Sequence, residues 1–224
     1  MTPLTFTLNN SPSFKLNCSQ LTPNLLANLT IEQIKNLKLT QSNNGPTVAD
    51  FFDVAGDDSQ NIQFKKSTVQ LDFIGHKMNK GTINIEGNAG DFLGSQMQNG
   101  TIICHGNTGD RLADQMRRGL ILVDGNAGEY CASRMIAGTI GVYGEVAQYI
   151  GYGMKRGTIL LTKTPNLHCT IQDCGTHHLP FLALLFKSFK SLHTKFNVIQ
   201  NQRVQRFAGD LACQGRGEIL VISP

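Results

Sequence analysis

The sequence predicts a mostly β fold: a right-handed parallel β-helix with nineteen-residue coils and small α+β caps at both ends. Three classes of residue hold one spacing of nineteen without an insertion. They are Met78, Met97, Met116, Met135 and Met154; Gly81, Gly100, Gly119, Gly138 and Gly157; and Gly87, Gly106, Gly125 and Gly144. A fixed period near twenty residues indicates a solenoid, whose repeats bury their apolar faces by stacking. Each repeat holds a short strand and a glycine turn, which leaves no room for a helix of about ten residues.

The strands predict the interior of the coil. Residues two apart in a strand point to the same side, and stacking places equivalent positions above one another. Two apolar ladders result: Ile83, Ile102, Ile121, Ile140 and Ile159, and Ile85, Cys104, Val123, Val142 and Leu161. We expect both ladders to face inward, where the repeated methionines fill the remaining space because their side chains adapt to irregular gaps.

The glycines predict tight turns at the corners of each coil, where φ is positive or a Cβ would meet the next coil. The structural glycines are Gly81, Gly87, Gly90, Gly100, Gly106, Gly109, Gly119, Gly125, Gly128, Gly138, Gly144 and Gly157. Asn88, Asn107 and Asn126 follow three of them, where we expect their side chains to bond along the stack. A phosphate-binding loop is disfavoured because no helix follows these glycines.

Three segments are predicted, and the first, residues 1–47, is an N-terminal cap. It contains strands at 4–8 and 14–17, a helix start at Thr22-Pro23, and a capping box formed by Thr30 and Gln33 before a turn of helix over 31–37. The second segment, 48–163, is the β-helix. Residues 48–55 begin a first irregular coil, because Gly56 lies nineteen before Gly75 and Phe64 nineteen before Ile83. Lys66 would fall on the inner ladder, so we expect the register to shift there.

The third segment, 164–224, is predicted to cap the other end. Residues 164–176 read as a loop. Residues 179–192 are apolar nearly all round at their start and predict a helix buried on at least two sides. Strands are expected at 203–207 and 218–223, on either side of a glycine loop.

Composition excludes several classes of protein. The net charge of +4 is mild and its basic residues are dispersed, which argues against nucleic acid binding. No apolar run is long enough for a membrane span and the N-terminus lacks a signal pattern, so we expect a cytoplasmic protein with no membrane partner. The six cysteines are then expected to be thiols. Abundant Asn and Gln favour a mesophilic source.

The turn Gly87-x-x-Gly90 and its copies at Gly106 and Gly125 resemble a glycine-repeat β-helix. That fold is shared by the C-terminal domain of the glutamate synthase large subunit and by the C-type subunit of formylmethanofuran dehydrogenase. The tail resembles the C-type subunit more specifically. It has the apolar helix, then Arg-Phe-Ala-Gly-Asp-Leu-Ala at 206–212 and Gly-Arg-Gly-Glu-Ile-Leu-Val at 215–221. The resemblance covers about residues 45–223.

The resemblance implies a non-catalytic subunit of an enzyme complex. In methylotrophic bacteria, a similar C-type subunit belongs to the formyltransferase/hydrolase complex of one-carbon oxidation. That complex transfers formyl from tetrahydromethanopterin to a methanofuran-type carrier and hydrolyses it to formate. Its partners would be an amidohydrolase-like subunit, a formyltransferase subunit and a further subunit. The alternative is the C-type subunit of tungsten or molybdenum formylmethanofuran dehydrogenase. The mesophile-like composition favours the bacterial complex, but the sequence leaves both open.

No catalytic constellation is evident from the sequence. Asp91, Asp110 and Glu129 form an acidic ladder, for which we expect bonds to backbone N–H groups or to Arg111; a partner's basic residue or a cation is the alternative. His168, Cys169, Cys174, His177 and His178 have the residue types that bind zinc, but not a standard spacing. A zinc-dependent enzyme is therefore the remaining alternative, while the resemblance implies no metal and no cofactor in this chain itself.

Two surfaces are predicted to be functional. The first is a basic cluster of Arg117, Arg118, Arg134, Lys155 and Arg156, which would bind the polyglutamate tail that the resemblance gives to the carrier; a solvated face is the alternative. The second is an outward apolar strip of Ile103, Leu120, Leu122 and Leu160, predicted as a partner interface. Either the helix at 179–192 or another subunit could cover this strip.

Overall fold

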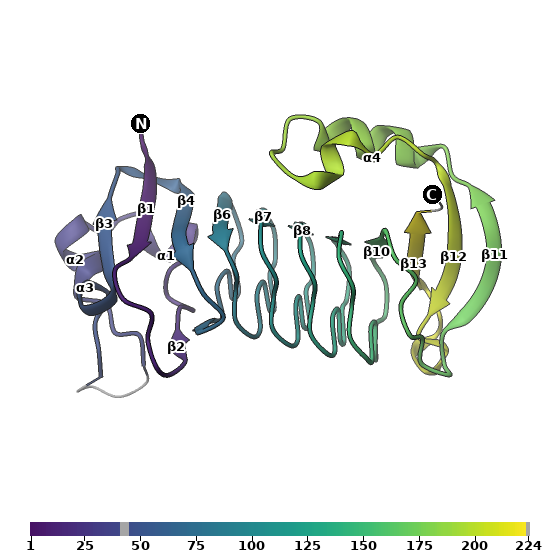
Figure 1. Cartoon of the computed structure of the whole chain (residues 1–224), viewed down its shortest axis with the longest axis horizontal. Helices are drawn as coiled ribbons and strands as arrows, with labels where there is room; N and C mark the ends of the chain where they lie inside the picture. The colour runs from purple at the N-terminus through teal and green to yellow at the C-terminus, as the bar shows by residue number, and fades with distance from the viewer. Residues whose placement is uncertain (41–44, 223–224) are drawn as a thin grey trace.

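The structure is a computed structural model that describes residues 1–40 and 45–222. One large, mostly parallel sheet runs along it, with the strand order β11-β12-β13-β10-β9-β8-β7-β6-β4-β1-β3 (Figure 1). At its centre stand β6 (Thr82–Gly87), β7 (Thr101–Cys104), β8 (Leu120–Val123), β9 (Thr139–Val142) and β10 (Thr158–Leu161). Each pairs in parallel with the strand of the following turn, so that Ile83, Ile102 and Ile121 lie side by side. The handedness of these turns stays a prediction.

The two inner ladders are confirmed. All ten side chains are fully buried, as are the five repeated methionines. The glycine before each strand makes this packing feasible. Gly119 has a φ of +109°, and a Cβ there would lie 2.8 Å from the carbonyl oxygen of Gly100 and 2.8 Å from Met97 Cε. Glycine at this corner therefore satisfies both the backbone conformation and the space beneath the neighbouring turn.

Positive φ also occurs at many residues other than glycine, which the sequence did not predict. Phe73, Phe92, Arg111, Tyr130 and Tyr149 occupy one equivalent position and have φ between 57° and 62°. The backbone N–H groups of the first four bond to the next turn, as in Phe73 N–H to Asp91 O at 2.9 Å. Their side chains stack outside the coil: the Phe73 and Phe92 rings are 4.6 Å apart, and Arg111 lies 4.8 Å from the Tyr130 ring. These contacts offset a strained backbone.

The N-terminal end contains four short elements where the sequence predicted them: β1 (Pro3–Leu8), β2 (Leu16–Asn17), α1 (Pro23–Leu26) and α2 (Ile31–Lys35). Four elements that were not predicted follow: α3 (Val48–Phe51), β3 (Phe52–Ala55), β4 (Asp58–Ser67) and β5 (Leu71–Asp72). Pro23 lies in the first turn of α1, and the capping box of Thr30 and Gln33 forms as predicted. β2 and β5 form a separate parallel pair.

The register predicted for the first coil is wrong. Phe64 lies beside Ile85 rather than Ile83, and Ile62 takes the place beside Ile83. Residues 48–55 form α3 and β3 instead of a coil, and β3 pairs antiparallel with β1. The cause is an irregularity at Lys66, which has a φ of 56° and is exposed. Burying this charge on the inner ladder would cost several kcal/mol, so the chain bulges there.

The C-terminal segment adds the last three strands to one end of the sheet. β13 (Gly217–Ile222) pairs in parallel with β10, and β12 (Arg203–Gly209) pairs antiparallel with β13. These strands were predicted, although Ser223 lies outside the described residues. The prediction of a loop over 164–176 is wrong for its second half, because β11 (Gln172–His178) forms an edge strand that pairs with β12. α4 (Phe181–Phe189) is shorter than predicted, and the expected burial on two sides is wrong, because only the face with Leu182, Phe186 and Phe189 is buried. η1 (Lys195–Val198) follows α4, and η2 (Leu211–Cys213) lies between β12 and β13. No helix among the described residues has the length and apolar character needed to cross a bilayer.

Candidate functional site: a basic pocket and a covered sheet face

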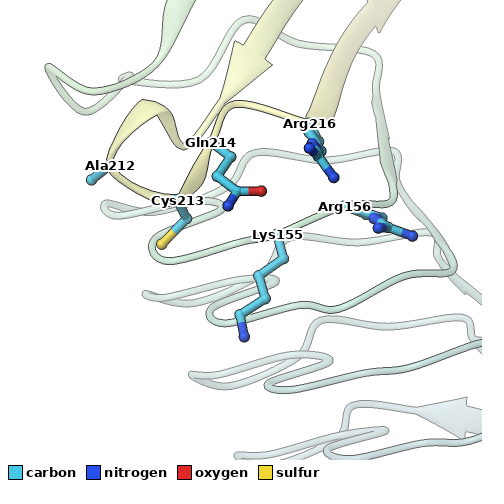
Figure 2. Close-up of a pocket in the computed structure, with 6 residues that line it drawn as sticks. All are labelled: Lys155, Arg156, Ala212, Cys213, Gln214 and Arg216. Atoms are coloured by element: carbon cyan, nitrogen blue, oxygen red, sulfur yellow. The ribbon is translucent and has the colours of Figure 1, made fainter.

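A basic pocket lies at the C-terminal end of the stack (Figure 2). It has a volume of about 380 Å³ and is lined by Lys155, Arg156, Ala212, Cys213, Gln214 and Arg216. Figure 2 shows the guanidinium groups of Arg156 and Arg216 on one side, with Lys155 extending along the stack and the Cys213 sulfur turned away from both arginines. The pocket therefore presents three cations and one amide.

Two short segments position these side chains. Lys155 and Arg156 precede Gly157, whose φ of +106° turns the chain into β10. The opposite wall is the loop from η2 to β13. Asp210 ties this loop to the coil by accepting a hydrogen bond from Gly153 N at 2.8 Å, and it accepts a second from Ala212 N, within the loop, at 3.0 Å. Burial acts to raise the pKa of Asp210, but these bonds and one from Thr170 outweigh it and lower that pKa below its ordinary value. Asp210 is thus a charged anchor for the pocket wall.

The structure brings together only part of the predicted basic cluster. Lys155 and Arg156 line the pocket, while Arg117 and Arg118 are exposed two strands earlier in the sheet. Arg134 is engaged elsewhere: its guanidinium binds buried Asp114, with Nη2 2.8 Å from Oδ2 and Nε 3.1 Å from Oδ1. That the cluster holds a carrier's tail stays a prediction. Arg216 was missed because it belongs to the non-repeating tail.

The predicted apolar strip lies beneath the chain's own C-terminal segment. Leu122 and Leu160 are fully buried and Ile103 is 5% exposed. Leu122 and Leu160 form an outer core, separate from the coil interior, with Leu182, Phe186, Phe189 and Phe196, and Leu120 packs against it. In Figure 1, α4 lies over this half of the sheet. Of the two covers left open by the sequence, the chain's own helix is therefore the one present; that the strip contacts a partner stays untested.

Polar anchors fix this covering segment, residues 179–199, which we call the strap. Asp124 accepts a hydrogen bond from Lys195 N at 2.8 Å and pairs with His105 Nδ1 at 2.9 Å. A Cβ on Gly141 would lie 2.9 Å from Cζ of Phe196, so the glycine admits this ring. The outer surface of the strap keeps three exposed apolar side chains: Phe181 at 45%, Leu184 at 74% and Val198 at 71%.

Asp91 and Asp110 of the acidic ladder serve the fold, as expected. Asp91 and Asp110 each accept a hydrogen bond from the backbone N–H of the next turn, at 2.9 and 2.8 Å. Asn88 and Asn107 do the same at 2.8 Å, which confirms bonding along the stack. These carboxylates and amides are therefore already engaged by backbone donors.

The histidines show structural contacts. His76 Nδ1 lies 2.7 Å from the hydroxyl of buried Ser95, and burial, aided by Lys77, lowers the pKa of His76. His168 Nδ1 lies 2.8 Å from Thr170 Oγ1, and His177 Nε2 lies 2.8 Å from the carbonyl of Cys174. In residues 1–40 and 45–222, no three His, Cys, Asp or Glu side chains are placed to hold a metal. The zinc alternative thus gains no support from the geometry.

Comparison with solved structures gives an informative match. No family model matches the sequence, and no curated protein matches it. The structure is similar to a chain of the X-ray crystal structure of the formyltransferase/hydrolase complex (FhcABCD) from Methylorubrum extorquens in complex with methylofuran. The two chains are 29% identical with a TM-score of 0.61, and the match covers 98% of this chain and 100% of that one. This chain is thus similar over its whole length to one subunit of a multi-subunit complex that binds methylofuran.

Proposed function

We propose that this chain is a non-catalytic structural subunit, equivalent to the C-type subunit, of a formyltransferase/hydrolase complex. The observation that carries the proposal is the end-to-end match at 29% identity, which spans both the stacked turns and the capping segments. A shared repeat alone would match only the middle of the two chains. The tail motifs at 206–212 and 215–221 independently resemble the C-type subunit.

The complex, on this proposal, transfers formyl from tetrahydromethanopterin to a methanofuran-type carrier and hydrolyses it to formate. The partners would be an amidohydrolase-like subunit, a formyltransferase subunit and a further subunit. The neighbour is itself a formyltransferase/hydrolase complex, which supports this complex over the dehydrogenase alternative. The chain would contribute a rigid body, a right-handed parallel β-helix, whose repeated Asn and Asp side chains tie each turn to the next.

The partner contact is proposed on the outer face of the strap rather than on the buried strip beneath it. Phe181 and Leu184 are exposed on α4, near Lys187 and Lys190, which are also exposed. Because the neighbour is part of a multi-subunit assembly, the occupant would be a partner subunit with an apolar patch and acidic rim. Leu184→Glu should weaken assembly and leave the melting temperature unchanged, because this side chain is 74% exposed.

Isolation of the tagged full-length chain from the organism that encodes it tests the proposal. We expect formyltransferase and amidohydrolase-like subunits in stoichiometric amounts, with formyl transfer and hydrolysis in the purified assembly. A molybdopterin-containing partner would instead establish the dehydrogenase alternative. Recovery of the chain alone, with no partner at physiological salt, would overturn the assembly role.

A second assay tests the absence of catalysis in the chain itself. The chain purified alone should show no formyl transfer or formyl hydrolysis, and activity should appear only when partner subunits are added. Hydrolysis by the isolated chain that is abolished by a chelator would support a zinc enzyme and refute the structural role.

A further inference from the structure

A row of aromatic rings, with one arginine in it, runs along the outside of the stacked turns. Its members at one equivalent position are Phe73, Phe92, Arg111, Tyr130 and Tyr149. The Phe73 and Phe92 rings stack with 4.6 Å between centroids, and the Tyr130 and Tyr149 rings with 4.8 Å. Tyr152 meets Tyr130 edge to face at 6.0 Å. None of these six side chains is buried, and Tyr149 and Tyr152 are 37% and 47% exposed. We call these six residues the ring row.

Arg111 has no charged partner in residues 1–40 and 45–222. Its Cζ lies 4.8 Å from the ring centroid of Tyr130 and 5.9 Å from that of Phe92, and its side chain makes no hydrogen bond or ion pair with the described residues. The nearby Arg134, in contrast, is paired with Asp114. Contact with rings uses the flat faces of a guanidinium, whereas its N–H donors lie in its plane. The donors of Arg111 are therefore left to bind an acceptor outside the chain.

The acids beside the ring row limit the kind of acceptor that fits. Asp91, Asp110 and Glu129 each stand one residue before a member of the row. Such a ladder repels nucleic acid or any other long polyanion. A single carboxylate, in contrast, forms a neutral pair with Arg111 through two parallel hydrogen bonds. Glu129 is exposed, and its side chain has no partner among the described residues, so it offers the opposite charge to an external cation.

The composition of the ring row is that of a protein interface. Tyr, Phe and Arg are enriched at the centres of interfaces, where they dominate the binding energy. Three of the chain's four tyrosines lie in the row. Stacking against the neighbouring turns already fixes these side chains, so binding would cost little further side-chain entropy. No member of the row belongs to the outer core beneath the strap, so this surface is separate from the strap.

We propose that the ring row is a docking surface for a partner protein that places an Asp or Glu carboxylate against Arg111 and apolar side chains against the rings. A lysine or arginine of the same partner would pair with Glu129. Two adjacent charges of opposite sign then fix the orientation of the partner. The proposal rests on the proposed assembly role, and it gives the chain a second contact surface besides the strap.

The first test removes the charge of Arg111 from the assembled complex. The tagged full-length chain is isolated with its partner subunits, and mass photometry on dilution gives the dissociation constant. Arg111→Met keeps a long side chain between the rings but leaves the partner's carboxylate unpaired, so we expect binding to weaken at least about tenfold. Arg203→Met is the matched control and should bind as wild type, because Arg203 is an exposed arginine whose side chain has no partner among the described residues.

The second test removes a ring. Tyr152→Ala should weaken the complex several-fold, because its exposed ring would be covered by the partner. Phe14→Ala is the matched control, since Phe14 is 48% exposed and makes one edge-to-face contact, with Phe51 at 5.8 Å. It should leave the dissociation constant unchanged. The isolated Arg111→Met and Tyr152→Ala chains should melt within a few degrees of wild type, because neither side chain is buried.

A carbodiimide cross-link tests the carboxylate directly and does not depend on a loss of affinity. Arg111→Lys retains a cation at this position, and carbodiimide joins its amine to a carboxylate that forms an ion pair with it. Mass spectrometry of the assembled complex should find a link between position 111 and an Asp or Glu of a partner subunit. Arg203→Lys should give no link to a partner.

The outcomes separate this proposal from the assembly role. Wild-type affinity in Arg111→Met, or links from position 111 to this chain's own acids alone, would overturn the docking surface while the assembly role stands. Recovery of the wild-type chain without partners would overturn both.

Discussion

Leu122→Glu is the sharpest test of how the strap is held. Leu122 is fully buried in the outer core, which shares no residue with the coil interior. Removal of a buried leucine costs about 2–5 kcal/mol, and an unpaired buried carboxylate adds several more. If the strap moves away from the sheet, position 122 becomes exposed and its carboxylate stays in water. Because Ile121 and Val123 point into the coil, the stack beneath should persist. We therefore expect local release of the strap rather than global unfolding.

Limited trypsin digestion with mass spectrometry measures this outcome, because Lys187, Lys190 and Lys195 lie in the strap. These sites should become sensitive while the stacked turns stay protected. Asn84→Glu is the matched control, since Asn84 holds the equivalent outward place on β6 but lies outside the outer core. A wild-type cleavage pattern and melting temperature in Leu122→Glu would refute the account of the strap.

Three further predictions concern the stack and its end. Ile121→Asp places an unpaired carboxylate on the fully buried ladder, so the protein should be insoluble on expression; soluble protein with wild-type melting would contradict the inward orientation. In Gly106→Ala the new Cβ would lie 2.4 Å from the carbonyl oxygen of Gly87, which is backbone, so circular dichroism should report loss of the cooperative fold; a melting temperature within a few degrees of wild type would contradict it. Asp210 has a lowered pKa, so its stabilisation exists above the usual Asp pKa of about 3.9 and is lost as the pH falls through the folded-state value. The melting-temperature difference between wild type and Asp210→Asn should therefore narrow from pH 6 towards pH 2, and a constant difference would contradict it.

The central stack could be predicted because each position is repeated. Ile102 and Ile121 are nineteen residues apart, and a slip by one residue would turn every isoleucine outward. The period therefore specifies the register without reference to any distant segment. The same argument located the Asn and Asp side chains, whose bonds reach the N–H group of the next turn.

Prediction failed where the chain leaves the repeat. β11 carries polar residues and Gly175, and it exists through its pairing with β12, about thirty residues later. No local pattern indicates that pairing. Arg216 likewise becomes a pocket residue only because β13 adds to β10. At the other end, Lys66 indicated a shift of register, but no local pattern indicated that Phe64 would lie beside Ile85.

The candidate functional surfaces of this chain lie where one turn carries a different type of residue from the turns beside it. Leu122 replaces the polar residue of Asn84, and its strand thereby gains an apolar outer face that holds the strap. Lys155 and Arg156 follow the neutral Ile136 and Ala137, and together with Arg216 they turn a corner of the coil into a cationic pocket. Side chains that keep the repeat pack or bond against the equivalent residues of the turns above and below, so they are not free to bind a ligand. A solenoid can therefore acquire a binding surface with little loss of stability only at positions that face outward. Exposed residues that differ from the residue repeated at their position are those whose substitution should alter binding rather than folding.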